Sequence, residues 1–253
     1  MQLFDAHAHL AAKEFAEDLP EVLARAEAVG MRGVVTVGET LEEAERILTL
    51  AECFPLVKPA AGLYPTMLDL NEAEAMQGFI RRHANRLVAL GDVGLDHWVV
   101  KDEEEWRIQE EILAKFVEFS NELELPVNVH SRSAGRRCIA FLKEHGARRV
   151  LLHAFDGKAA SAMEGVGAGY FFSIPPSVVR SSQKQKLVRS LPLECLLLES
   201  DSPVLGPDPA VRNEPMNVTV SCRAIAELKG VSPEEVARIT TENARRLFPR
   251  AFA

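Results

Sequence analysis

The sequence lacks the features of a membrane or exported protein. No apolar run reaches the about 18 residues that a membrane-spanning helix requires. The chain passes almost directly into the segment LFDAHAHL, without the basic stretch and apolar stretch of a secretory signal peptide. We therefore expect a soluble, cytoplasmic protein that has no membrane partner.

Cysteine is sparse and scattered. The 253 residues include four cysteines, and no two of them form a CxxC pair. They are Cys53, Cys138, Cys195 and Cys222. This distribution predicts buried reduced thiols and argues against both a disulfide framework and a thiolate metal site.

Basic residues are also fewer than acidic residues. Lysine and arginine together number 29 against 37 aspartates and glutamates, which gives a net charge of −8. A protein that grips long duplex DNA through a broad basic surface is usually positive. Any contact with nucleic acid should therefore be local, or should be helped by bound cations.

The sequence has no low-complexity segment and no recognisable linker. Its length suits an α/β barrel folded as one domain, so we expect a single domain over residues 1–253. Short apolar runs predict strands at Leu3–Ala8, Gly33–Val37, Leu56–Ala61, Leu87–Gly91, Val127–Val129, Val150–Leu152, Tyr170–Phe172 and Leu196–Leu198. Between them, amphipathic periodicity predicts helices at Phe15–Val29, Leu41–Glu52, Asn71–His83, Glu103–Glu122, Gly135–His145, Lys158–Gly165 and Gln183–Arg189.

This alternation of strands and helices predicts a parallel sheet. Eight such units favour closure into a (β/α)8 TIM barrel, although periodicity alone leaves a doubly wound open sheet as an alternative. Four prolines between Pro203 and Pro215 predict a long loop on the barrel rim. Additional helices are expected at Val218–Lys229 and from Pro233 to about Phe248, the latter capped by Ser232.

The first strand ends in an HxH pattern. Residues i and i+2 of a strand point the same way, so His7 and His9 present two imidazoles to one side. Catalytic groups of a barrel gather at the carboxyl ends of its strands. A metal-ligand pair is the favoured interpretation, and two polar residues that merely close a strand are the alternative.

Further histidines and aspartates recur where other strands end. They are Asp92, His130, His153 and Asp201. Packing does not readily explain apolar strands that repeatedly end in such residues. Together with the HxH pair, they predict a metal centre on one rim of the barrel.

Residues for substrate binding are less clearly marked. Arg132, with the hydroxyl of Ser131 beside it, could grip a phosphate, or could simply begin a solvated helix. His97 is either a substrate contact or a plain loop residue. Asn213 lies in the proline-rich rim loop, where polar groups suit substrate recognition.

The chain resembles the TatD family of metal-dependent hydrolases, within the amidohydrolase-like barrels, over nearly its whole length. The resemblance lies in the ordered blocks DAHAHL, GLYP, GDVGLDHW, LPVNVHSR, LLHAFDG, LLLESDSP and RNEPMNV. It implies a barrel with one or two divalent ions and phosphodiester hydrolysis, typically as a deoxyribonuclease. Carried over, His7 and His9 hold one ion with Asp201, and His130 and His153 hold the second.

The sequence departs from the family pattern at Asp92, where a bridging glutamate is usual. Aspartate is one methylene shorter, and a bridging carboxylate must reach two ions about 3.5–4 Å apart. The shorter side chain of Asp92 puts in question the occupancy of the second metal site more than that of the first. His97 also stands where the family has an aromatic residue.

The expected enzyme is a metal-dependent hydrolase that acts on ester bonds. Asp201 and Asp92 are its expected catalytic carboxylates, and its expected substrate is a DNA end, a short single strand or a small phosphodiester. Mixed imidazole and carboxylate ligands suit Zn, Mn, Co or Ni, and the resemblance to the TatD family adds Mg.

Hydrolysis of an amide, lactone or aminoacyl ester is an alternative function. A non-catalytic metal-binding protein is another, and no obligate protein partner is implied.

Overall fold

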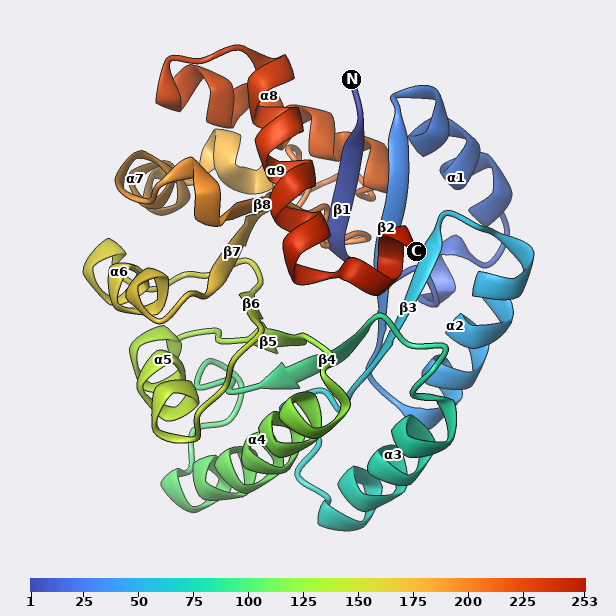
Figure 1. Ribbon diagram of the computed structural model, residues 1–253, viewed down its shortest axis with the longest axis vertical. Coiled ribbons are helices and arrows are strands. Elements are labelled where there is room, and N and C mark those ends of the chain that lie inside the picture. The colour runs from blue at the N-terminus through green and yellow to red at the C-terminus, as the bar shows by residue number, and fades with distance from the viewer.

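The computed structural model describes residues 1–253 and forms a parallel eight-stranded sheet in which the strands follow one another in chain order (Figure 1). This order confirms the predicted barrel, because a doubly wound sheet reverses direction at a switch point. The strands are β1 (Leu3–Ala8), β2 (Met31–Gly38), β3 (Val57–Ala61), β4 (Ala89–Gly94), β5 (Val127–His130), β6 (Val150–Leu152), β7 (Phe171–Ile174) and β8 (Leu196–Leu198).

The ring closes between β1 and the segment that follows β8. The backbone N–H of Asp201 donates to the carbonyl oxygen of His7 at 2.9 Å, and that of His9 donates to Ser202 at 2.8 Å. The side chain of Asp5 accepts from the backbone of Ser200 at 2.8 Å. These bonds bring the carboxyl ends of the first and last strands together, although their residues are nearly 200 positions apart in the sequence.

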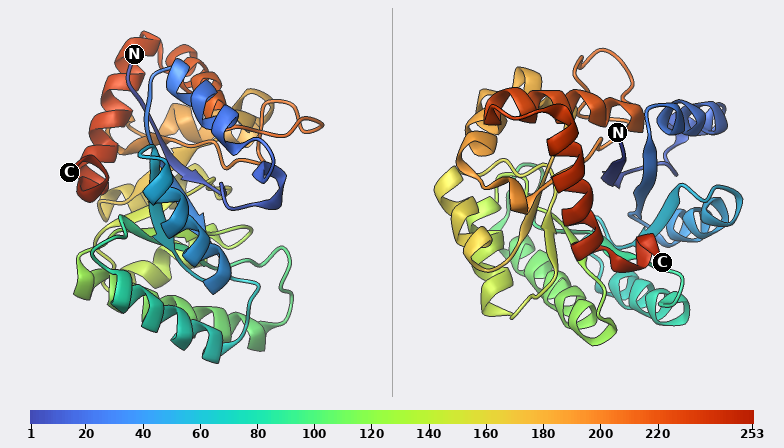
Figure 2. Two further views of the ribbon diagram at one scale, coloured as in Figure 1. Left: turned by 90° about the vertical axis from the view of Figure 1, so that its right-hand side faces the viewer. Right: turned by 45° about the horizontal axis from the view of Figure 1, so that its top comes forward.

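A helix follows each of the first seven strands, and Figure 2 shows these helices in the outer layer of the barrel. They are α1 (Leu19–Ala28), α2 (Leu41–Cys53), α3 (Leu70–His83), α4 (Glu103–Leu123), α5 (Gly135–Glu144), α6 (Ala159–Gly167) and α7 (Ser182–Ser190). Helix α2 shows how they form. Its Ala44, Ile47 and Leu48 are buried, and Thr40 caps its start by accepting from the backbone of Glu43.

The remaining helices are α8 (Val218–Lys229) and α9 (Pro233–Leu247). Helix α9 and the turn after it run across the amino-terminal end of the barrel (Figure 2). There Leu247 and Phe248 join Phe4 and Val88 in a separate buried apolar cluster. Because this cluster fills one end of the barrel, only the opposite, carboxyl end is available to form a site.

The structure corrects some predicted details. Helix α1 begins at Leu19 rather than at Phe15, because Pro20 lacks an N–H group and fits only in a first helical turn. Strand β4 continues to Gly94, so Asp92 lies within the strand instead of after it. All four cysteines are free and three are buried as predicted, but Cys53 is exposed. No helix combines the length and apolar character needed to cross a membrane.

Candidate metal centre

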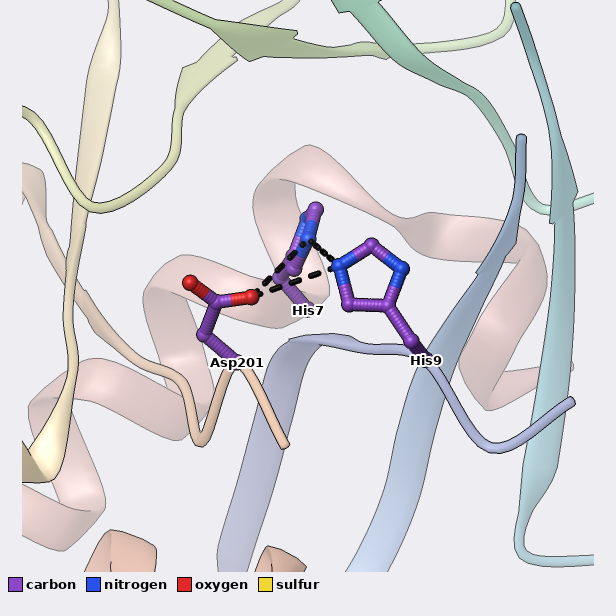
Figure 3. Close-up of side chains that lie close together, drawn as sticks. All are labelled: His7, His9 and Asp201. Carbon is purple, nitrogen blue, oxygen red and sulfur yellow. Dashed lines mark hydrogen bonds and ion pairs between the residues drawn. The ribbon is translucent and has the colours of Figure 1, made fainter. Parts of the chain in front are cut away.

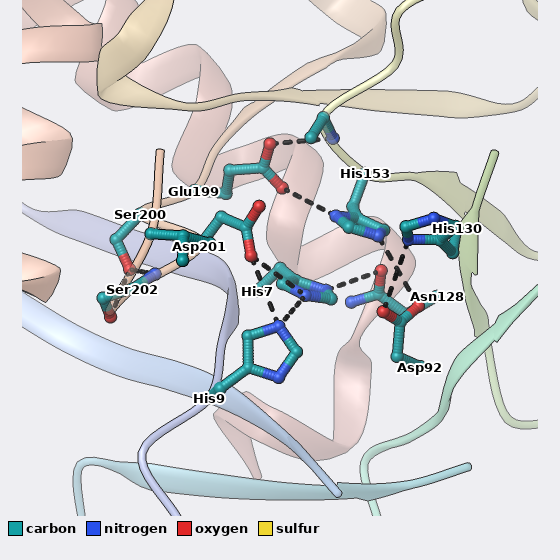
Figure 4. Close-up of polar contacts among 12 residues, drawn as sticks. His7, His9, Asp92, Asn128, His130, His153, Glu199, Ser200, Asp201 and Ser202 are labelled. Carbon is teal, nitrogen blue, oxygen red and sulfur yellow. Dashed lines mark hydrogen bonds and ion pairs between the residues drawn. The ribbon is translucent and has the colours of Figure 1, made fainter. Parts of the chain in front are cut away.

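All six predicted ligands come together at the carboxyl end of the barrel (Figure 4), and Figure 3 shows His7, His9 and Asp201 more closely. In the first part of the site, Nε2 of His7 lies 3.1 Å from Nε2 of His9. Oδ1 of Asp201 lies 3.3 Å from the His9 nitrogen and 3.6 Å from the His7 nitrogen. The three ligand atoms therefore face a common point, which is the arrangement that a metal ion requires.

Asp201 reaches this position through an unusual backbone conformation. Its φ of 50° lies in the left-handed region, which residues other than glycine seldom adopt. The hydrogen bond from its backbone N–H to His7 holds the residue there. Such conformations cluster at functional sites, because the surrounding structure must compensate for their strain.

Asp92 joins this part of the site to the second part. Its Oδ1 lies 3.5 Å from Nε2 of His153, and its Oδ2 lies 3.7 Å from Nδ1 of His130. The ring of His153 also stacks on that of His7, with their centroids 3.8 Å apart. Each oxygen of the short carboxylate thus faces a different histidine.

Several atoms at the centre have no hydrogen-bond partner. Both carboxylate oxygens of Asp92 and both ring nitrogens of His153 are buried and unpaired. Buried polar atoms are nearly always paired, because leaving them without a partner costs free energy. A divalent cation would satisfy them, and the nitrogen and oxygen donors around them are ordinary ligands for such an ion. The residues present therefore fit a metal centre.

Two of the ligand histidines are oriented by amide or carboxylate groups behind them. Nδ1 of His7 lies 3.1 Å from Oδ1 of Asn128, whose amide nitrogen donates to the carbonyl of Ala6. Because the Asn128 oxygen can only accept, His7 carries its proton on Nδ1 and turns the lone pair of Nε2 toward the site. Nε2 of His130 likewise donates to Oδ2 of Asp96 at 3.0 Å, which leaves Nδ1 facing Asp92. Metal-binding histidines commonly have such partners.

Asp96 also organises the loop after β4. Its Oδ1 accepts from the backbone N–H groups of Trp98 at 2.8 Å and Val99 at 2.7 Å. Burial opposes ionisation of Asp96, but the hydrogen bonds from His130 and these backbone groups outweigh it and lower the pKa of Asp96. Its carboxylate is therefore charged, and each of its two oxygens can accept hydrogen bonds.

The centre also includes two glutamates that were not predicted from the sequence. Glu39 directly follows β2, and its Oε1 lies 3.6 Å from Nδ1 of His9. Glu199 lies just past β8, where it accepts from the hydroxyl of Ser173 and approaches Nδ1 of His153 to 3.9 Å. Burial raises the pKa of each glutamate to about 7. Glu39 could have been found, because it follows the same strand-end rule as the predicted ligands.

Burial and neighbouring charges shift the pKa values of the histidines and aspartates at the centre. Burial lowers the pKa of His7 to about 3, so this imidazole is neutral, as a ligand must be. Burial acts in the same direction on His9, but its hydrogen bond to Asp201 and the nearby carboxylates raise its pKa to about 9. Nearby histidines hold the pKa of Asp92 and of Asp201 below the usual range despite burial. Two charged aspartates therefore face the point where the histidines converge.

The predicted substrate-binding residues lie near this centre in different environments. Arg132 is exposed, whereas the hydroxyl of Ser131 is buried and unpaired. His97 is half-buried, and its ring stacks on Trp106 at a centroid distance of 4.0 Å. Burial lowers the pKa of His97. Their contact with a substrate remains a prediction.

Asn213 has a different position from the one expected for a substrate-binding residue. Its side chain is buried, and its amide nitrogen donates to the carbonyl oxygens of Ser200 and Val204 at 2.6 and 2.7 Å. Its carbonyl oxygen accepts from the amide of Asn217. Asn213 therefore supports the turn that carries Asp201 and has no exposed polar atom to offer a substrate.

A parallel eight-stranded barrel with histidines and carboxylates converging at its carboxyl end defines the class of metal-dependent barrel hydrolases. The chain belongs to the TatD related DNase family, whose family model matches residues 4–249.

Individual proteins of this family are similar along nearly the whole chain. Deoxyribonuclease TATDN3 of Homo sapiens is 46% identical over 260 residues, which cover 98% of this chain and 95% of that protein. The uncharacterized metal-dependent hydrolase YabD of Bacillus subtilis is 36% identical over 255 residues, or 97% of this chain and 98% of its own. The crystal structure of YjjV, a TatD homolog of Escherichia coli, superposes with a TM-score of 0.89 at 28% identity and covers 98% of both chains.

Proposed function

We propose that this protein is a metal-dependent deoxyribonuclease that hydrolyses phosphodiester bonds at DNA ends or in short single strands. The observation that carries the proposal is the convergence of four histidines with Asp92 and Asp201, some of whose buried polar atoms lack protein partners. Membership of the TatD related DNase family and the similarity to deoxyribonuclease TATDN3 support the choice of DNA as the substrate.

The proposed centre holds one or two divalent ions of Mg, Mn, Zn, Co or Ni. His7, His9 and Asp201 form the first ligand group, and His130 and His153 form the second, with Asp92 between the groups. A divalent ion bound here activates water and neutralises charge on the phosphate. The supporting atoms of Asn128 and Asp96 keep the imidazoles of His7 and His130 turned toward the site.

Asp201 is the proposed catalytic base. Its carboxylate is charged, lies at the converging histidines and is held in place by its own backbone hydrogen bond to His7. In the proposed reaction it orients the attacking water and accepts the proton that the water loses. The water oxygen then forms a bond to phosphorus while the bond to the leaving oxygen breaks. Arg132, which is exposed at the same end of the barrel, contacts a neighbouring phosphate.

The charge of the protein favours short substrates in this proposal. With a net charge of −8, the chain has no excess of cations to neutralise a long duplex. Local contacts at one rim suit a strand end or a short single strand. We further propose that residues 1–253 act as one domain, because a single core cluster of 59 buried residues extends from Leu3 to Ala237.

Digestion of end-labelled single-stranded and duplex DNA with added Mg²⁺ or Mn²⁺ tests the proposal. We expect metal-dependent shortening of the single strand, and loss of that activity in Asp201→Asn. Asp208→Asn serves as the matched control, because Asp208 is exposed in the same rim loop and only caps the backbone of Ala210.

The alternative chemistries are tested in parallel. The folded, metal-loaded protein is offered amides, lactones and aminoacyl esters under the same conditions. Cleavage of one of these, with no cleavage of DNA under any metal, would contradict the proposal. Absence of all hydrolysis despite bound metal would indicate a metal-binding protein that does not catalyse.

A further inference from the structure

The loop after β4 presents an exposed tryptophan beside the metal centre. Trp98 is 57% exposed, and it lies two residues after Asp96, whose carboxylate contacts the ligand His130. A single exposed apolar residue is common on protein surfaces and by itself indicates nothing. The surroundings of this indole, however, are specific.

Two cations lie over the Trp98 ring, close enough for cation–π contact. The Lys101 ammonium lies 5.1 Å from the ring centroid, and the Arg132 guanidinium carbon lies 5.3 Å from it. Neither cation has an ion pair with a carboxylate, and Lys101 bonds only to the carbonyl oxygen of His97. Two cations without acidic partners around one exposed aromatic face are notable in a protein of net charge −8.

The backbone that carries this group is firmly held. Asp96 accepts from the N–H groups of Trp98 and Val99, and the N–H of His97 donates to the carbonyl oxygen of Arg132 at 3.0 Å. On the far side of the loop, the indole nitrogen of Trp106 donates to Val100 at 3.0 Å. The backbone that carries the exposed indole is thus held in position before any ligand binds, which reduces the entropy lost on binding.

The group is also connected to the catalytic end of the barrel. Asp96 contacts His130 with one oxygen and the Trp98 backbone with the other. Arg132 follows His130 by two residues. Asp96 and Arg132 therefore connect the indole to the part of the barrel that carries His130. A groove of about 960 Å³, lined by His97, Arg136 and Lys158 among others, adjoins the same loop.

We propose that Trp98 is a stacking surface for a nucleobase of single-stranded DNA, and that Lys101 and Arg132 contact the phosphates on either side of that base. Aromatic rings stack on every base, and cations at their edges bind the backbone. A base inside a duplex already stacks on its neighbours, so this surface selects single strands and frayed ends. The inference rests on the proposed function and names the part of the substrate that the Trp98 loop recognises.

Tryptophan fluorescence provides the first test. The protein has two tryptophans, so Trp106→Phe leaves Trp98 as the only indole. A phosphorothioate-linked oligothymidylate is titrated into this metal-loaded variant, beside the same oligomer with abasic sites. We expect quenching by the base-bearing oligomer and about 5- to 150-fold weaker binding of the abasic one. Equal affinity for both oligomers, or no quenching, would overturn the inference.

Substitutions provide the second test. Trp98→Ala should raise KM for a short single strand about tenfold or more, leave KM for its abasic counterpart unchanged, and be largely rescued by Trp98→Phe. Val99→Ala is the matched control, since Val99 is 56% exposed in the same loop and has no ring. Arg132→Gln should reduce the slope of log affinity against log salt by about 1. If Trp98→Ala and the parent cleave both substrates with the same KM, the stacking role is wrong.

The two proposals fail in different ways. Cleavage of DNA that is unaffected by Trp98→Ala would remove the stacking role and leave the nuclease activity standing. Base-dependent quenching of Trp98 without cleavage of any DNA would support the stacking surface and contradict the proposed reaction.

Discussion

Nε2 of His130 donates to Oδ2 of Asp96 at 3.0 Å, while Oδ1 of the same carboxylate accepts from the backbone N–H groups of Trp98 and Val99. One buried side chain thus fixes the ring of a metal ligand and the loop beside it. Asp96 is fully buried and acts through His130 and the loop backbone, so it is a positioning residue. The orientation of the ligand and the shape of the adjoining rim depend on the same carboxylate.

Asp96→Asn should therefore weaken metal binding and activity together. An amide has only one accepting oxygen, so it cannot serve both His130 and the loop backbone. Loss of such a supporting contact typically reduces metal affinity or activity by about 10- to 100-fold. Calorimetric titration with Mn²⁺ measures the affinity. Asp102→Asn, at the exposed start of α4, is the control, and equal affinities in both variants would count against this role.

Asp92 is one methylene shorter than the usual bridging glutamate. Bridging with a small backbone shift, binding of one ion only and contact through water are the alternatives, and its contacts allow a test. Its two oxygens already face different histidines, at 3.5 and 3.7 Å. Asp92→Asn removes one ligand charge and should lower the affinity of the second ion by at least about 10- to 100-fold. Asp92→Glu keeps the charge but adds a methylene to a buried position, so it should retain metal and lose about 1–3 kcal/mol of stability.

Elemental analysis and denaturant unfolding separate these two effects. We expect a reduced metal-to-protein ratio for Asp92→Asn and an unchanged ratio for Asp92→Glu. The opposite order would show that carboxylate charge at this position is not what holds the ion.

The convergence of the six candidate ligands could be predicted because barrel topology places every strand's carboxyl end on one rim. The predicted bounds of β1, β6 and β8 agree with the structure. His7 lies in β1, His9 lies just after it, and His153 directly follows β6, as the pattern indicates. Strand ends are local features of the sequence, so no knowledge of distant contacts was needed.

The supporting residues could not be predicted in the same way. Asn128 contacts His7 across 121 positions, and Asp96 contacts His130 across 34. An asparagine within a strand and an aspartate in a loop show no pattern that reveals these partners. Asn213 was misinterpreted for the same reason, because its rim-loop position suggested exposure while its amide is enclosed by the turn that it supports.

The contacts of Glu214 in the rim loop predict a defined dependence of stability on pH. Hydrogen bonds from Arg25 at 2.8 Å, followed by one from Arg212, hold the pKa of Glu214 below its usual value of 4.5. Because the folded pKa is depressed, this stabilisation is present in full above about pH 4.5 and is lost as the pH falls through the folded value. Glu214→Gln should therefore lower the free energy of unfolding at pH 7 by up to about 1 kcal/mol.

Urea unfolding of the parent and of Glu214→Gln at a series of pH values checks this prediction. The difference between them should shrink steadily below about pH 4.5. Glu21→Gln, in the exposed first turn of α1, provides the comparison. A difference that persists unchanged at acid pH would show that the Arg25 and Arg212 contacts are not its source.

Removal of metal should destabilise the protein. An ion that binds only the folded state at 100 times its Kd contributes about 2.7 kcal/mol. For a chain of this size, that corresponds to a rise in Tm of about 5–10 °C. Thermal scans after chelation, with and without added Mn²⁺, should show this rise in the parent and in Asp208→Asn, and a much smaller one in Asp201→Asn. Equal shifts in all three would place the stabilising ion elsewhere.

Crystals loaded with Mn²⁺ and measured for anomalous scattering provide the most direct test of the metal centre. We expect an anomalous peak in contact with His7, His9 and Asp201, and, if a second ion binds, another peak in contact with His130 and His153. Asp92 should lie between the two positions. A loaded crystal whose anomalous peaks all lie away from these side chains would contradict the assignment.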